Sequence, residues 1–230
     1  MPVKFFLEIH DFGMLLPGMD NLLKIKEIYP NFKITAFTIP MPKEFFLPDN
    51  QKHFTKDKYR KWAEIVNSYD WLEVGMHGFA HTYYEFDCVY DKAAMALKAG
   101  ENLWKVAGLK YKKLFVAPYW QYSYDALNAL KDGGWAVGVD RNHPIPIPKG
   151  LKTFTYNWSY DEELPKGDRD RRHGKIIGHG HYYHTEGSRN AIDDCYYNII
   201  RQIPKDAEFG FISELMEGGD KSEKNNQKSN

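Results

Sequence analysis

Short apolar runs rich in Val, Ile and Phe alternate with longer segments of helical periodicity along most of the chain. This alternation is typical of β-α units, because a parallel strand needs a crossover, usually a helix, before the next strand. About eight runs have the length and composition of buried strands. The sequence therefore predicts an α/β fold with a largely parallel sheet. The expected strands are Val3–Ile9, Lys33–Ile39, Trp71–Met76, Leu114–Ala117, Trp135–Val139, Thr153–Tyr156, Lys175–Gly178 and Glu208–Ile212.

Two of the intervening segments carry apolar residues at helical spacing. Such stripes predict helices that bury one face against the sheet, and a cofactor-binding role for them is less common. The first stripe is Tyr59, Trp62, Ile65 and Val66, and the second is Ala96, Ala99, Leu103, Trp104 and Ala107.

The length and composition favour a single domain. The chain has 230 residues, of which 43% are hydrophobic, and this is enough apolar material for one sizeable core. We expect this domain to span residues 1–216. The tail 217–230 contains no apolar residue, so it cannot offset its ordering entropy and is predicted to be disordered.

Composition also excludes several partners. The 31 Lys and Arg residues balance 31 Asp and Glu residues without a dense basic stripe, so we expect no nucleic-acid partner. Cys88 and Cys195 are too few for a disulfide framework or a thiolate zinc site, and we expect both to be reduced. The N-terminal apolar run breaks at Glu8 and no other stretch reaches spanning length, so we expect a cytoplasmic protein without a membrane span.

Polar residues directly follow five of the expected strands. In a parallel α/β barrel the carboxyl ends of the strands form the active face, so separate segments of the chain meet there. The sequence therefore predicts one functional site that draws on all five segments. These segments are His10–Asp11, His77 with His81, Pro118–Trp120, Asp140, and His179 with His181.

His77 and His81 are spaced i and i+4, so both imidazoles reach one cation if a helical turn follows the strand. Asp11 would add a carboxylate oxygen. This set suits a catalytic Zn²⁺, and Co²⁺, Ni²⁺, Mn²⁺ or Fe²⁺ use the same ligands. A lone His or Asp after a strand more often caps a helix or pairs with the backbone, so the metal prediction rests on all three residues together.

The segment Glu73-Val-Gly-Met-His77-Gly-Phe-Ala-His81 resembles the second motif of NodB-type polysaccharide deacetylases, carbohydrate esterase family four. Three further segments resemble the family's other motifs and follow one another in the family's order. The first motif resembles His10-Asp11-Phe-Gly, the third resembles Ala117-Pro118-Tyr119-Trp120, and the last resembles Ile176-Ile-Gly-His179-Gly-His181. The resemblance runs from about residue 3 to residue 212. It implies a distorted TIM-like (β/α)7-8 barrel.

The resemblance also implies roles for these residues. The three predicted ligands would hold the metal, and one histidine of the His179 and His181 pair, preferably His179, would be the general acid. The backbone amide of Tyr119 would face the oxyanion. In such enzymes the metal polarises an acetamide carbonyl and activates a water, and an imidazolium protonates the leaving amine, so acetate and a free amine result.

Two positions depart from the family's motifs. The usual catalytic base is the first residue of an Asp-Asp pair, and here it is His10. A histidine suits this task near neutral pH, and Glu8, two residues earlier on the same strand face, is the alternative base. The third motif usually carries an arginine where this chain has Val116. We interpret the two changes as coupled, because a neutral imidazole at position 10 needs no arginine partner at position 116.

Other strand-end residues have predicted supporting roles. Asp140 is expected to hold the catalytic imidazole in its tautomer, with a salt bridge to Arg141 as the alternative. Trp120 and Trp158 are expected to pack against sugar rings, with burial in the core as the alternative. His181 is expected to line the groove if His179 is the acid.

The function expected from these features is metal-dependent hydrolysis of carbon–nitrogen amide bonds, as N-deacetylation of an amino sugar in a glycan or glycan precursor. A non-sugar amidase of the same fold is the second hypothesis, and a small closed pocket would favour it over an open aromatic groove. A catalytically inactive glycan-binding protein is the third, supported by the changes at His10 and Val116. The sequence leaves the oligomeric state undetermined.

Overall fold

The computed structural model describes residues 3–14, 19–42, 54–166, 174–182 and 191–218. Its centre is a nine-stranded sheet in the order β6-β5-β4-β3-β2-β1-β8-β7, with β9 paired to β1. Every pair of strands is parallel, as the alternating pattern predicted. The strands are β1 Lys4–Phe12, β2 Ile34–Thr38, β3 Leu72–His77, β4 Leu114–Val116, β5 Ala136–Gly138, β6 Thr153–Phe154, β7 Trp158–Ser159, β8 Lys175–His181 and β9 Glu208–Gly210.

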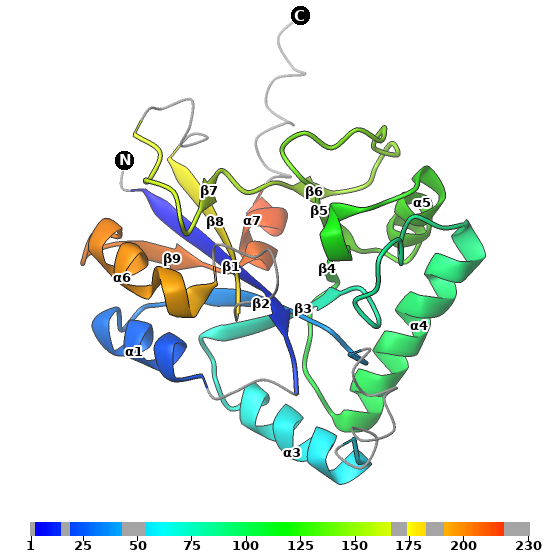
Figure 1. The fold of residues 1–230 in the computed structure, drawn as a ribbon, viewed down its shortest axis with the longest axis horizontal. Helices are drawn as coiled ribbons and strands as arrows, with labels where there is room; N and C mark the ends of the chain where they lie inside the picture. Colours follow the sequence, from blue (N-terminus) through cyan, green and yellow to red (C-terminus); the bar gives the residue numbers. More distant parts are fainter. Residues whose placement is uncertain (1–2, 15–18, 43–53, 167–173, 183–190, 219–230) are drawn as a thin grey trace, which may run out of the picture.

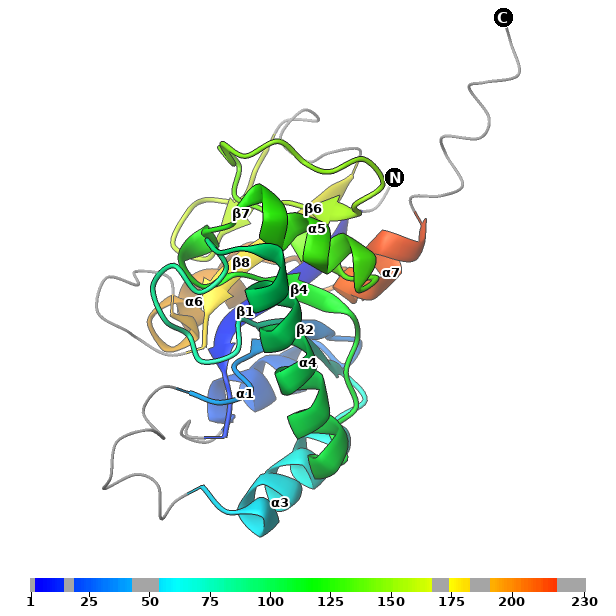
Figure 2. The ribbon, with the colours of Figure 1, turned by 90° about the vertical axis from the view of Figure 1, so that its right-hand side faces the viewer.

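The sheet is curved, and most helices lie around its outside (Figure 1). Within the described residues no pairing joins the outer strands β6 and β7, so the barrel is open there. The side view shows α3 and α4 crossing one flank of the sheet (Figure 2). The helices are α1 Asp20–Ile28, α3 Lys56–Asn67, α4 Tyr90–Ala107, α5 Tyr124–Asp132, α6 Ile192–Gln202 and α7 Ile212–Gly218, with a short 3-10 turn, η2, at Pro118–Trp120.

Alternation along the strands divides the apolar residues into two clusters. On β1, Phe5, Leu7 and Ile9 join the large cluster that also contains the buried helix residues. Phe6 instead joins a second cluster built from the opposite strand faces, which lies inside the barrel. Ile212 at the start of α7 belongs to this interior cluster. Helix α7 therefore covers the amino-terminal end of the barrel and leaves the carboxyl end for the site.

All eight expected strands are present, with some ends displaced. Strand β7 was not predicted, because two residues are too short for a periodic pattern. The predicted last strand ended too late, since Ile212 begins α7, and this helix continues through Gly218 into the predicted tail. The remainder of the tail, 219–230, lies outside the described residues.

The helix stripes are confirmed in part. Tyr59 and Val66 are buried on α3, but Ile65 is 56% exposed and does not belong to the core. On α4 the buried face is shifted relative to the predicted one. It consists of Ala93, Leu97, Gly100, Trp104 and Ala107.

Neither Cys88 nor Cys195 forms a disulfide in the described part of the chain. Among the helices of the described ranges, none has the length and apolar character needed to cross a membrane.

Candidate metal centre and active site

The inward faces of β1 and β8 change from apolar to polar toward their carboxyl ends. Glu8 pairs in register with His179, and His10 pairs with His181. Since side chains two residues apart share a strand face, Glu8 and His10 follow Phe6 into the barrel interior. The predicted convergence is confirmed for His10, His179 and His181, although these residues lie within strands and do not follow them.

Asp11 joins this polar layer through an irregularity in β1. Strict alternation would turn the residue after His10 away from the barrel interior. The register with β2 shifts between Ile9 and Phe12, and Asp11 has a φ of 58°. A bulge of this kind redirects a side chain, and here it brings the Asp11 carboxylate to the histidines of β3 and its loop.

Asp11, His77 and His81 form a compact set of ligand atoms. Oδ1 of Asp11 lies 3.3 Å from Nε2 of His77 and 2.9 Å from Nε2 of His81. Ligands bound at about 2.0–2.1 Å to a tetrahedral ion are separated by roughly 3.3 Å, which resembles this spacing. Asp11 and His77 are buried, and His81 lies at the rim. The set predicted from the sequence is therefore assembled in space.

The hydrogen bonding of His77 makes this cluster suited to a cation. Its Nδ1 lies 3.0 Å from the carbonyl oxygen of Val116. A carbonyl only accepts, so Nδ1 carries the proton and the Nε2 lone pair of a neutral ring faces Asp11. Burial lowers the pKa of His77, which favours that neutral ring. Two acceptors in contact repel unless a cation lies between them, so the residues fit a divalent metal.

The charge state of Asp11 agrees with this arrangement. Burial by itself would raise the pKa of its carboxyl group, but the adjacent His77 and His81 rings outweigh burial and lower the pKa below its usual value. Asp11 therefore offers an anionic ligand oxygen.

The segment after His77 is an irregular loop, and the predicted helical turn is absent. Gly78 and His81 both have positive φ, 63° and 58°. The Glu85 carboxylate holds this loop by accepting hydrogen bonds from the amides of Phe79, Ala80 and His81 at 3.1, 2.7 and 3.2 Å. Glu85 was not predictable from the sequence, because no local pattern distinguishes it from a surface carboxylate.

We predict that Glu85→Ala leaves the three loop amides without their acceptor and disturbs the position of His81. The free energy of unfolding should fall by roughly 2–4 kcal/mol, and the affinity for Zn²⁺ by about 10–100-fold. Urea denaturation and calorimetric titration with Zn²⁺ measure these effects. The matched control is Asp87→Ala, which removes an exposed carboxylate two residues away. Equal behaviour of the two variants would contradict a positioning role for Glu85.

Glu8 lies between two imidazoles. Its carboxylate is fully buried, and Oε1 is 3.5 Å from Nε2 of His10 and 3.3 Å from Nδ1 of His179. Burial raises the pKa of Glu8, whereas hydrogen bonding and charge interaction with His179 oppose that rise. Burial lowers the pKa of His10 well below its usual value, and neighbouring imidazoles lower it further. His10 is consequently a neutral ring, as a general base requires.

These shifts predict how stability depends on pH in the metal-free protein. Unfolded His10 titrates near 6.5 and the folded ring titrates lower, so the unfolded state binds more protons between the two pKa values. The stability that His10 contributes is present above pH 6.5 and is lost as the pH falls below that value. Urea denaturation at about pH 7.5 and about pH 5.5 should show a larger loss for wild type than for His10→Phe. An identical loss in both proteins would refute the assignment.

Asp140 does not have its predicted role. Its carboxylate accepts hydrogen bonds from the amide of Asn142 at 2.8 Å and the hydroxyl of Tyr156 at 3.3 Å. The Tyr156 ring lies between Asp140 and His179, with ring centroids of Tyr156 and His179 4.6 Å apart. The carboxylate beside His179 is Glu8. The alternative salt bridge is also wrong, since Arg141 pairs with Glu162 at 3.3 Å.

The two predicted tryptophans have different positions. The Trp120 ring is 5.1 Å from that of His10 and 5.3 Å from that of His179, so it borders the site. Trp158 has no exposed surface, and its Nε1 donates to the carbonyl oxygen of Glu162. The prediction that Trp158 contacts sugar is therefore wrong, and its alternative, a core position, is confirmed.

Two tyrosines form an exposed aromatic pair beside the metal ligands. The rings of Tyr83 and Tyr119 are stacked at 3.9 Å with an interplanar angle of 11°, and Tyr119 lies 5.2 Å from the ring of His81. The two residues are 64% and 38% exposed. Such planes are suited to packing against a sugar ring. Tyr83 was not predicted, because its only sequence signal is its closeness to His81.

Backbone strain is concentrated around the same site. In the described part of the chain, the non-glycine residues with positive φ all belong to strand-end segments near the ligands. Each such conformation costs about 1–3 kcal/mol and persists only where surrounding structure enforces it. Strain of this kind clusters at functional sites. The residues are Asp11, His81, Tyr84, Tyr119 and Trp120.

No protein-family model matches this sequence, and none of the curated proteins is similar to it. Similar solved structures exist. A putative polysaccharide deacetylase from Mycobacterium smegmatis is 14% identical with a TM-score of 0.59, and the match covers 95% of this chain and 91% of that one. A family 4 acetyl xylan esterase from Clostridium thermocellum, in complex with a cobalt ion, is 15% identical with a TM-score of 0.53 and coverages of 92% and 89%.

A third similar structure is a CE4 family pseudoenzyme from Bacillus anthracis, which is 16% identical with a TM-score of 0.54. The match covers 94% of this chain and 66% of that one. At such low identity these likenesses establish the fold. The predicted NodB-type (β/α) barrel is thereby confirmed, and active and inactive proteins share it.

Proposed function

We propose that this chain is a member of carbohydrate esterase family four and removes the acetyl group from an N-acetylated amino sugar in a metal-dependent hydrolysis. The observation that carries the proposal is the convergence of Asp11, His77 and His81, with the Nε2 lone pair of His77 directed at the Asp11 carboxylate. A structural core position needs no such pair of facing acceptors. The barrel fold and its similarity to deacetylase structures support the same conclusion.

Zinc is the metal we propose for these three ligands, and Co²⁺, Ni²⁺, Mn²⁺ and Fe²⁺ accept the same donor set. When bound, such an ion polarises the acetamide carbonyl and lowers the pKa of a water molecule. The protein contributes ligand orientation. The Val116 carbonyl fixes the His77 tautomer, and Glu85 fixes the loop that carries His81.

The remaining chemistry is proton transfer by the chain's own residues. His10, held neutral by burial, accepts a proton from the attacking water. His179 donates a proton to the nitrogen of the leaving amine. Burial lowers the pKa of His179, and its contact with Glu8 opposes that shift and favours the protonated ring. Glu8 contacts both rings and stabilises the positive charge that either ring acquires. We assign the supporting role to Glu8, which takes the place predicted for Asp140.

The surroundings of the ligands favour a sugar substrate over a small amide. The exposed Tyr83 and Tyr119 pair offers a flat surface beside His81, and Trp120 borders the two acid–base histidines. An enzyme for small cyclic amides needs a closed pocket in their place. The Tyr119 amide remains our candidate for the oxyanion donor.

A direct test is to load the purified protein with Zn²⁺ and incubate it with oligomers of N-acetylglucosamine. We expect release of acetate and of free amines in equal amounts, and loss of both after chelation and dialysis. The alternative hypothesis, a catalytically inactive glycan-binding protein, has support from the Bacillus anthracis pseudoenzyme of the same fold. Binding of the oligomers without acetate release, in protein shown to contain metal, would favour that alternative.

A further inference from the structure

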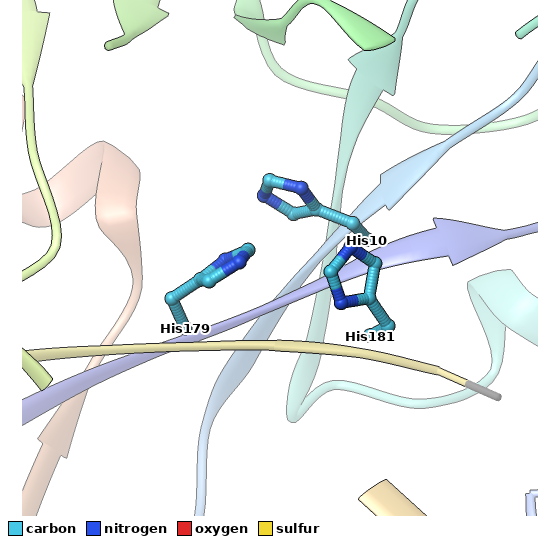
Figure 3. A group of neighbouring side chains, drawn as sticks. All are labelled: His10, His179 and His181. Carbon is cyan, nitrogen blue, oxygen red and sulfur yellow. The ribbon is translucent and has the colours of Figure 1, made fainter. Parts of the chain in front are cut away.

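A second group of ligand atoms lies beside the proposed metal site. His10, His179 and His181 present ring nitrogens within 4.8 Å of one another. Figure 3 shows the three rings converging, with His10 coming from β1 and the other two from β8. Their ring centroids are 4.5 Å apart for His10 and His179, and 5.7 Å apart for His10 and His181.

Glu8 lies beside this group. Its Oε1 is 3.5 Å from Nε2 of His10 and 3.3 Å from Nδ1 of His179. Among the described residues, the buried Nε2 of His10 has no hydrogen-bond partner with good geometry. Buried polar atoms of this kind call for a ligand such as an ion.

Asp11 connects the two groups. Its Oδ1 faces His77 and His81, while Oδ2 lies 3.9 Å from Nε2 of His181. A carboxylate with one oxygen directed at each cluster is suited to bridging two neighbouring ions, as in sites where two metals lie about 3.5–4 Å apart.

We propose that His10, His179 and His181 form a second Zn²⁺ site, with the Glu8 carboxylate beside them, next to the Asp11, His77 and His81 site. Imidazole nitrogens are typical zinc ligands. Repulsion between two neighbouring divalent ions makes the second ion bind more weakly than the first. A further consequence, which rests on the proposed function, is that the second ion inhibits deacetylation, because an ion at this site occupies the residues that transfer protons.

The first test measures stoichiometry without activity. Metal-free protein is titrated with Zn²⁺ by calorimetry, and the content is checked by elemental analysis after equilibrium dialysis. Wild type should bind two ions per chain with different affinities. Two variants should lose the weaker ion: His10→Phe, and His181→Asn at the partly exposed rim. The affinity for this ion should fall by more than about 100-fold, because removing a ligand costs more than removing a supporting group. His143→Ala, an imidazole outside both groups, should retain two ions.

The outcomes separate this inference from the proposed function. A single ion in wild type that is lost in His77→Ala leaves the proposed function intact and overturns the second site. Two ions in wild type that persist in both His10→Phe and His181→Asn also overturn it. A second ion lost in these variants, while the first remains, establishes the site whether or not the protein deacetylates any sugar.

The consequence for turnover is tested with excess Zn²⁺. Wild-type deacetylation should decline as the weaker site fills, with a midpoint equal to the calorimetric dissociation constant of the second ion. Inhibition unrelated to that constant would refute the inhibitory role.

Discussion

His77→Ala should abolish the retention of a divalent ion at the first site and reduce deacetylase turnover by more than about 10³-fold. The expected loss corresponds to several kcal/mol of transition-state stabilisation, because both carbonyl polarisation and water activation depend on the ion. Elemental analysis of the purified variant, together with acetate release from N-acetylglucosamine oligomers, measures the two effects. Asp11→Ala should behave in the same way.

Control measurements make this result specific. His77 also donates to the Val116 carbonyl, so circular dichroism must show that the variant is folded. His143→Ala, which removes an imidazole remote from the ligands, should keep both metal and turnover. If His77→Ala retained the same metal content and activity as this control, the proposed site would be wrong.

His179→Ala should have a different signature, since it should retain the ion at the first site and still lose turnover by about 10²–10⁴-fold. The reason is that His179 does not belong to the ligand group of that site and that its Nδ1 instead contacts Glu8 at 3.3 Å. Metal content, circular dichroism and the pH dependence of kcat/KM together measure this. The variant should lose the limb of the pH profile that reports the general acid.

His181→Asn is the matched comparison for His179→Ala. Both residues lie on the inward face of β8, but His179 is buried beside Glu8 and His181 is at the rim. We expect His181→Asn to keep most of the turnover measured at low Zn²⁺. The reverse pattern, with full activity in His179→Ala and a large loss in His181→Asn, would assign the acid to His181.

Much of this molecule was predictable from local patterns in its sequence. The apolar runs were sufficient to predict eight strands and a parallel sheet, because a strand that is buried on both faces consists of a continuous apolar run, which is visible in the local sequence. The positions of His77, His81, His179 and His181 near strand ends predicted their convergence, since parallel strands end at a common face of a barrel. Errors in the predicted strands were confined to their boundaries and to the short strand β7, where no periodic pattern exists.

Only the tertiary structure decided which segments far apart in the sequence contact one another. The bulge that turns Asp11 inward depends on register with β2, and the pairing of Glu8 with His179 depends on β1 lying beside β8. Glu85 became a loop anchor only where three amides converge on it. Asp140 and Trp158 satisfy strand-end patterns, yet their side chains have other partners. The sequence alone determined which strand ends carry polar residues, whereas three-dimensional packing determined which of these side chains enter the site and meet, because side-chain partners depend on register and loop geometry.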